Sequence, residues 1–162
     1  MQEFQNRLIS WNYIVKNSKN KDNFVKKIWE KENMKVLTIK QPWATLIMQK
    51  DKRFEFRSWQ TKYRGELLIH AGKGIDKEAM KRLAKYIPEN MPIGKILGKV
   101  RLVDCVKISP EFKEMLLKEN KDIYTDSSFK ENYGWQLEDV EVFKEPLEAK
   151  GKLSLWEYNI EK

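Results

Sequence analysis

The alternation of apolar and polar residues between positions 53 and 59 predicts a β-strand. Successive side chains of a strand point to opposite faces, so Phe54 and Phe56 would share one face, and Glu55 and Arg57 the other. Two charged side chains of opposite sign are therefore expected side by side on one surface of this strand.

The rest of the chain beyond residue 34 mixes strand-like and helix-like patterns. Helices are predicted after Pro42, over residues 75–87, and from Pro110 to about residue 119 with Ser109 as the cap. Further strands are predicted over residues 36–40, 66–71, 96–108, 133–143 and 152–158. Short strands mixed with helices predict an α+β fold, with a small β-barrel flanked by helices.

The first 33 residues follow a different pattern. Apolar residues recur at helical spacing from Phe4 to Val15 and again from Phe24 to Trp29, on either side of a polar connector at residues 17–23. We predict a helical hairpin over residues 1–33, as an N-terminal extension of a domain at residues 34–162. Its apolar side either packs on that domain or contacts a protein partner.

Composition excludes several classes of protein. The chain of 162 residues is long enough for one domain, and its single Cys and single His exclude a disulfide framework and the usual zinc sites. No metal and no cofactor are predicted, although oxygen-ligand metals stay open. The sequence shows no apolar run of the roughly 18 residues that span a bilayer, and no signal peptide at its start. We expect a cytoplasmic protein with no membrane contact.

Charge is unevenly distributed along the chain. The formal net charge is +8, yet residues 34–102 carry 16 basic and 6 acidic side chains, whereas residues 103–162 carry 9 and 14. A strongly basic stretch indicates a polyanionic partner such as nucleic acid. The alternative is a lysine-rich surface without a specific partner.

The densest mixture of functional side chains lies between residues 40 and 64. Glu55, Arg57 and Trp59 fall on one strand face, Lys52 precedes that strand, and Arg64 follows it. These residues either form a solvated charge ladder of little energetic consequence or line a binding cleft.

Several motifs in this region resemble ASCH domains, the homology domain of activating signal cointegrator proteins. Residues 38–47 (TIKQPWATLI) resemble the opening signature of the family, and residues 50–57 (KDKRFEFR) resemble its Gly-x-Lys-x-x-Glu-x-Arg motif, with Lys50 in place of the Gly. Later segments also fit in the right order: residues 57–65 (RSWQTKYRG), 93–98 (IGKILG), 103–105 (VDC), 133–135 (YGW) and 155–156 (LW). The resemblance covers about residues 34–158.

The resemblance implies a PUA-like β-barrel with a cleft lined by Lys52, Glu55 and Arg57. It also implies binding of RNA or DNA, or a coactivator role, and some branches of the family are enzymes. In the amidohydrolase branch a Thr nucleophile stands where this chain has Glu55. A carboxylate cannot replace that hydroxyl without a change of mechanism.

We therefore predict a module that binds RNA or other single-stranded nucleic acid in a cationic cleft. Bases would stack on Trp43 or Trp59, Glu55 would accept hydrogen bonds from a base, and the cations would hold phosphates. The predicted nucleic-acid-binding residues are Lys40, Gln41, Trp43, Lys50, Lys52, Glu55, Arg57, Trp59, Arg64, His70 and Lys73.

Two alternatives stay open. The same cleft would serve a ribonuclease or a nucleoside hydrolase if Lys52 and Glu55 acted as an acid–base pair, with His70 assisting. His70 is otherwise a structural residue. The second alternative is a coregulator-like protein-interaction module that uses residues 1–33.

Overall fold

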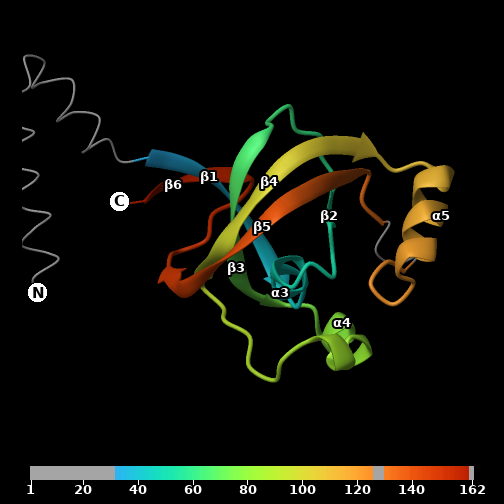
Figure 1. The fold of residues 1–162 in the computed structure, drawn as a ribbon, viewed down its shortest axis with the longest axis horizontal. Helices are drawn as coiled ribbons and strands as arrows, with labels where there is room; N and C mark the ends of the chain where they lie inside the picture. The colour runs from blue at the N-terminus through green and yellow to red at the C-terminus, as the bar shows by residue number, and fades with distance from the viewer. Residues whose placement is uncertain (1–31, 126–129, 161–162) are drawn as a thin grey trace, which may run out of the picture. The chain divides into compact units, whose positions relative to one another are not determined.

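The computed structural model describes residues 32–125 and 130–160 (Figure 1). The hairpin predicted for residues 1–33 falls almost wholly outside these ranges, so it stays a prediction. The described elements are β1 (Glu32–Gln41), α3 (Trp43–Met48), β2 (Phe54–Arg57), β3 (Gly65–Ile75), α4 (Lys77–Arg82), the 3-10 helix η1 (Ala84–Tyr86), β4 (Lys95–Lys107), α5 (Pro110–Glu119), β5 (Tyr133–Glu148) and β6 (Leu155–Ile160).

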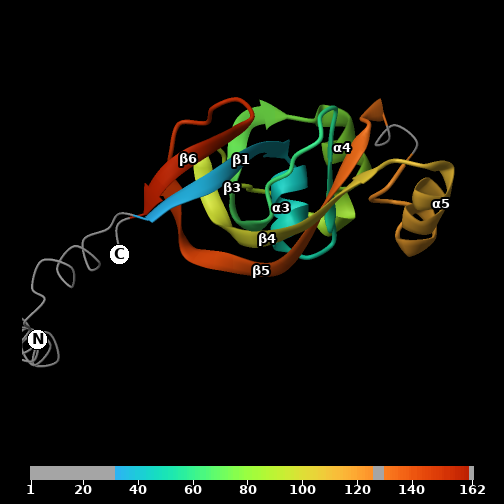
Figure 2. The ribbon, with the colours of Figure 1, turned by 90° about the horizontal axis from the view of Figure 1, so that it is seen from above.

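The strands form one six-stranded sheet of mixed direction in the order β2-β5-β4-β3-β1-β6. β1 and β3 run parallel, whereas β3, β4, β5 and β2 pair antiparallel in turn. The predicted α+β class is confirmed, but the predicted closed barrel is wrong. Within the described residues the sheet begins at β2 and ends at β6, and it curves without joining these two edges (Figure 2).

The core fills the space between the curved sheet and α3. α3 contacts β3, β4 and β5, and it lies near the centre of the sheet in both ribbon views (Figures 1 and 2). Five of its six residues are buried. Ala44, Ile47 and Met48 pack against apolar side chains of these strands, whereas Leu46 packs in a second cluster that includes residues of β2, α4 and α5. Cys105, Trp135 and Trp156 are buried too, as small and large core residues. The segment after Pro42 is therefore held helical chiefly by packing.

Several elements differ from their predicted bounds: β3 runs through Ile75 where the predicted strand ended at residue 71, and β1 begins at Glu32 instead of residue 36. Two further differences have local causes. The helix predicted at residues 75–87 is split into α4 and η1, and α4 starts where Asp76 accepts a hydrogen bond from the Ala79 amide. β5 continues through Pro146 to Glu148, whereas the predicted strand ended at residue 143. Its pairing with β4 is irregular between Val142 and Leu147, so the missing proline N–H breaks no regular ladder.

α5 begins as predicted, since the Ser109 hydroxyl accepts from the Phe112 amide. None of the helices in the described ranges is long and apolar enough to span a membrane.

Candidate functional site

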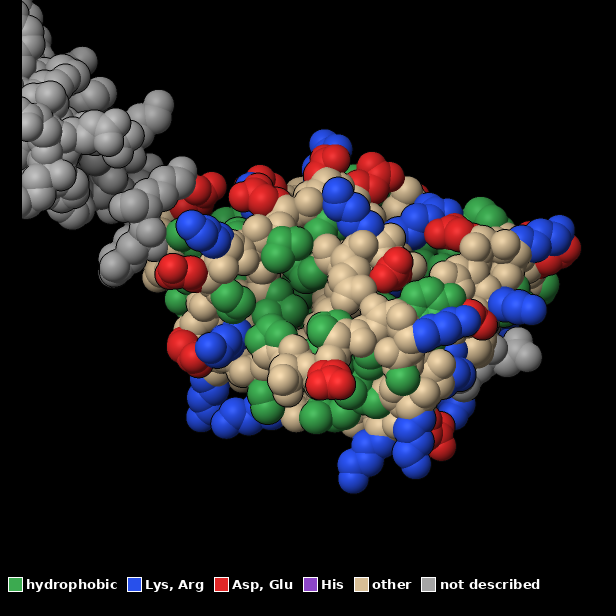
Figure 3. All heavy atoms as spheres, turned by 60° about the horizontal axis from the view of Figure 1, so that its bottom comes forward, with side chains coloured by type: hydrophobic (Ala, Val, Ile, Leu, Met, Phe, Trp, Pro, Cys, Tyr) green, Lys and Arg blue, Asp and Glu red, His purple; other side chains and the backbone are tan. Residues whose placement is uncertain are grey.

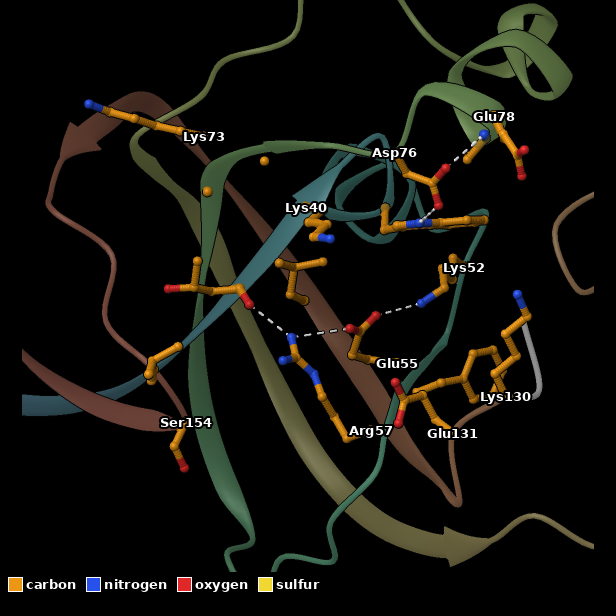
Figure 4. A pocket seen from close by; sticks show the side chains of 18 of the residues that line it. Lys40, Lys52, Glu55, Arg57, Lys73, Asp76, Glu78, Lys130, Glu131 and Ser154 are labelled. Atoms are coloured by element: carbon orange, nitrogen blue, oxygen red, sulfur yellow. Dashed lines mark hydrogen bonds and ion pairs between the residues drawn. The ribbon is translucent and has the colours of Figure 1, made fainter. Parts of the chain in front are cut away.

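A pocket of about 750 Å³ opens between β1 and β2, on the side where the edge strand β2 has no paired neighbour. These strands are not neighbours in the sheet order, and a side chain connects them: Arg57 Nη2 of β2 donates to the Thr38 carbonyl of β1 at 2.8 Å. We call this cavity the seam pocket (Figure 4). It is lined by Thr38, Ile39, Lys40, Trp43, Lys52, Glu55, Phe56, Arg57, Gly72, Lys73, Gly74, Asp76, Glu78, Ala79, Arg82, Lys130, Glu131, Lys152, Leu153 and Ser154.

Three charged side chains, Lys52, Glu55 and Arg57, form a connected row in the seam pocket, which we call the charged trio. Lys52 Nζ donates to Glu55 Oε2 at 2.6 Å, and Arg57 Nη2 lies 3.2 Å from Glu55 Oε1 (Figure 4). The side chains are 4%, 10% and 24% exposed, respectively. The alternative of a solvated charge ladder therefore does not describe them, because Lys52 and Glu55 are withdrawn from water.

Lys52 is the most enclosed member of the charged trio. Its ammonium lies 5.4 Å from the ring centre of Trp43 and 5.2 Å from that of Phe56. Burial lowers the pKa of Lys52 below its usual value, and the neighbouring Glu55 carboxylate opposes that effect. A lysine in such surroundings gives up its proton more readily than one at the surface.

A second set of contacts fixes the indole of Trp43. Its Nε1–H donates to Asp76 Oδ2 at 3.1 Å, while Asp76 Oδ1 accepts from the Ala79 amide at 3.0 Å. The carboxylate that caps α4 thus also orients Trp43. Because Lys52 lies over the ring, one face of Trp43 is already in use.

Cations outnumber acids around the seam pocket. Its lining holds seven Lys or Arg side chains and four Asp or Glu side chains. Five of the cations lie outside the charged trio, and we call them the rim cations: Lys40, Lys73, Arg82, Lys130 and Lys152. Figure 3 shows a face on which Lys and Arg side chains, interspersed with acids, surround a centre of apolar and backbone surface.

Six of the eleven predicted binding residues line the seam pocket: Lys40, Trp43, Lys52, Glu55, Arg57 and Lys73. Three cations in the lining were not predicted, namely Arg82, Lys130 and Lys152. They come from segments remote in sequence, and only their place in the fold reveals them.

The other five predicted residues lie elsewhere. Gln41 is buried and bonded to the Pro92 carbonyl and the Thr45 amide, and Lys50 is exposed in the turn after α3. Trp59 packs edge-on against the core residue Trp135, with 4.6 Å between the ring centres. Arg64 forms an ion pair with Asp104. His70 is also buried, in hydrogen bonds with Thr38 and Ala149.

The arrangement is a cavity with more cations than acids in its lining and with one enclosed carboxylate, Glu55. Among the described residues, no group of three or more His, Cys, Asp or Glu side chains is placed to hold a metal ion. The lining residues supply hydrogen bonds and ion pairs, and Lys52 and Glu55 also offer a pair of groups for proton transfer.

Comparison with known proteins agrees with the motifs. The ASCH domain model matches residues 37–148. Activating signal cointegrator 1 from Homo sapiens is 38% identical over 89 residues, and that from Mus musculus is 36% identical over 104 residues. These matches cover 48% and 57% of this chain, which spans only 15% and 17% of the relatives' lengths.

Among solved structures, ASCH from Zymomonas mobilis is similar with a TM-score of 0.47 and 14% identity, over 71% of this chain and 73% of that one. The family model by itself covers more than half of the sequence, including the charged trio. The chain therefore belongs to the ASCH domain family.

Proposed function

We propose that this protein binds single-stranded nucleic acid, with RNA favoured over DNA, in the seam pocket. The observation that carries the proposal is the charged trio, which is set in a pocket whose lining carries seven cations against four acids. A cavity with a positive rim attracts phosphates, and a carboxylate inside it adds a selective acceptor.

Glu55 is the residue that would distinguish a base from a simple anion. Each of its oxygens has one cationic partner, and a carboxylate offers about four acceptor sites, so capacity remains for a base N–H. A bare phosphate would be repelled by Glu55 and attracted by the rim cations. A nucleotide suits both the carboxylate and the rim cations, with its base toward Glu55 and its phosphate toward the rim.

Stacking is assigned to Trp43, not to Trp59. Trp43 lines the seam pocket and is held in place by Asp76, whereas Trp59 packs on Trp135 and does not line it. Lys52 covers one face of Trp43, so a base would stack on the part of the ring that the pocket leaves accessible.

The test is the affinity of the full chain for a fluorescently labelled single-stranded RNA, measured by anisotropy. Lys40→Glu reverses a rim charge, and we expect it to weaken binding at least about tenfold, since it loses one phosphate contact and adds a repulsion. Lys62→Glu is the matched control, because Lys62 is exposed and outside the pocket lining. A Lys40→Glu affinity within twofold of the control would contradict the proposal, as would tighter binding of the same sequence as DNA.

A hydrolase that acts on RNA or a modified nucleoside is the second candidate. The observation in its favour is that Lys52, with a lowered pKa, donates directly to Glu55 at the pocket wall. Labelled RNA and acylated nucleosides incubated with the protein would give new products only if this candidate holds. Any such activity should vanish in Glu55→Gln under conditions where circular dichroism shows that variant folded.

A further inference from the structure

A second cavity adjoins the seam pocket, and we call it the side pocket. It measures about 870 Å³ and is lined by Thr38, His70, Gly72, Lys73, Ile93, Gly94, Glu148, Ala149, Lys150, Gly151, Lys152 and Leu153. Five of these residues also line the seam pocket: Thr38, Gly72, Lys73, Lys152 and Leu153. The two cavities therefore meet along one boundary.

Two lysines stand on that boundary. Lys73 belongs to β3 and Lys152 to the loop between β5 and β6, and both are exposed. Within the described ranges neither ammonium group is ion-paired with a carboxylate, although Lys152 lies 5.7 Å from the Trp156 ring centre. Two cations beside two cavities are suited to a phosphate that links two groups.

Apolar side chains are exposed at the side pocket. Leu153 is 94% exposed on the boundary, and Ile93 is 43% exposed in the side pocket alone. Covering an exposed apolar side chain with a base removes apolar surface from water and so lowers the free energy. The side pocket thus combines an apolar surface with a cationic edge, as a base with its phosphate requires.

The loop that carries Lys152 and Leu153 is held in place by contacts with His70. His70 Nε2 donates to the Ala149 carbonyl at 2.8 Å, and its Nδ1 lies 3.2 Å from the Thr38 hydroxyl, which accepts from Trp156 Nε1 at 3.0 Å. In this tautomer the Thr38 hydroxyl donates to Nδ1, and each polar atom has a partner. Gly151 packs against the ring so closely that a Cβ would lie 2.8 Å from His70 Cε1.

We infer that the ligand of this protein is a strand of at least two nucleotides, with one base in the seam pocket and the next in the side pocket. Lys73 and Lys152 hold the phosphodiester that links them, and Ile93 and Leu153 contact the second base. This inference rests on the proposed function. His70 acts as a positioning residue for the wall between the two cavities.

The test is competition against the labelled RNA by ribonucleoside 5′-monophosphates and by ribodinucleotides with a single linking phosphate. Both competitors carry one phosphate, and the dinucleotide adds a second nucleoside. Its diester bears a single negative charge, whereas the monophosphate bears nearly two, so tighter binding of the dinucleotide cannot come from charge and reports the added nucleoside. We expect the dinucleotides to compete at least about fivefold better, from the contact of one more base. Equal competition by the two would overturn the inference but not the proposed function. If the labelled RNA itself fails to bind, both fail.

Variants locate the second base. Ile93→Glu should reduce dinucleotide competition to the mononucleotide level and leave mononucleotide competition within twofold, because Ile93 lines the side pocket only. Met115→Glu is the matched control, since Met115 is 44% exposed on α5 and lines neither cavity. Unchanged dinucleotide competition in folded Ile93→Glu would also overturn the inference.

Discussion

At the scale of single residues, the charged trio bears on stability as well as on the proposed function. Breaking a buried ion pair by removing one partner costs more than the pair contributes, because the other charge stays buried without compensation. Glu55→Gln would leave the ammonium of Lys52, 4% exposed, without its carboxylate. We expect the free energy of unfolding in urea at neutral pH to fall by about 3 kcal/mol.

The exposed pair of Arg53 and Glu119 is the control. Its side chains are 40% and 34% exposed, so Glu119→Gln should change the free energy of unfolding by less than about 1 kcal/mol. Replacing both buried partners, as Lys52→Met with Glu55→Leu, should recover most of the loss. Equal effects of Glu55→Gln and Glu119→Gln would contradict the argument.

Strand alternation predicts that Glu55 and Arg57 share one face, because they lie two positions apart in β2. Lys52 lies before that strand, and its place in the charged trio is implied by the resemblance to the family motif. The sequence does not predict the role of His70. The partners of that side chain, Thr38, Ala149 and the loop around Gly151, come from distant segments. A lone histidine in a strand pattern carries no signal that separates a ligand contact from a structural hydrogen bond.

At the scale of elements, Tyr124 ties the segment after α5 to the start of β2. Its hydroxyl accepts from the Arg53 amide at 2.9 Å, and burial raises its pKa to about 12. The unfolded chain loses this proton near pH 10 while the folded chain keeps it, so the contribution of Tyr124 to stability is present below pH 10 and lost as pH rises toward 12.

Tyr124→Phe removes this titration. We expect the stability difference between the wild type and Tyr124→Phe to shrink by about 1 kcal/mol between roughly pH 9.5 and 11, on top of any constant loss of packing. Urea unfolding at both pH values measures it. Lysine titrations are common to the two proteins and cancel, so a difference that does not vary with pH would refute the assignment.

Gly98 marks the point where β4 passes closest to β5 and α3. A Cβ there would overlap the Glu141 carbonyl oxygen and lie 2.8 Å from Met48 Sδ. We expect Gly98→Ala to lower the free energy of unfolding by about 3 kcal/mol, as overpacking against backbone does. In Gly74→Ala the Cβ would meet only the flexible Lys40 chain at 3.3 Å, so a loss near 1 kcal/mol or less is expected. Thermal unfolding of both variants checks the order.

The closed barrel was predicted wrongly for a reason that lies at this scale. Alternation patterns identify strands and their faces, but they do not tell whether the two edge strands of the sheet pair with each other. Here the two edge strands, β2 and β6, are not neighbours in the sheet, and the side chain of Arg57 connects β2 to β1, the strand next to the β6 edge. The gap that remains is the seam pocket, so the feature that the sequence missed is also the candidate site.

At the scale of the whole molecule, the uneven charge of the sequence is partly cancelled by folding. Three of the four basic residues of β4 face acidic residues of β5 and β3. Lys95 pairs with Glu148, Arg101 with Asp139, and Lys99 with Glu66 and Glu141. The hydrogen bond to Glu66 also raises the pKa of Lys99. The basic stretch at residues 34–102 therefore overstates the charge available to a ligand.

The salt dependence of RNA affinity distinguishes the rim cations from the cations of β4 that are paired with carboxylates. Only charges that contact phosphates release counterions from the RNA when it binds. Each phosphate contact on a single strand contributes about −0.7 to the slope of log affinity against log salt. Three contacts at the rim cations give a slope near −2, which is about a hundredfold loss of RNA affinity between roughly 50 and 500 mM salt.

Lys73→Ala with Lys152→Ala should reduce the steepness of that slope by about 0.7, since the two lysines share one phosphodiester of the proposed strand and have no carboxylate partner among the described residues. Lys99→Ala removes the same kind of charge where carboxylates already neutralise it, and should leave the slope within about 0.3 of the wild type. Anisotropy titrations at four salt concentrations measure all three slopes. If Lys99→Ala flattens the response as much as the loss of Lys73 and Lys152, the RNA responds to overall charge, and the two cavities are not where it binds.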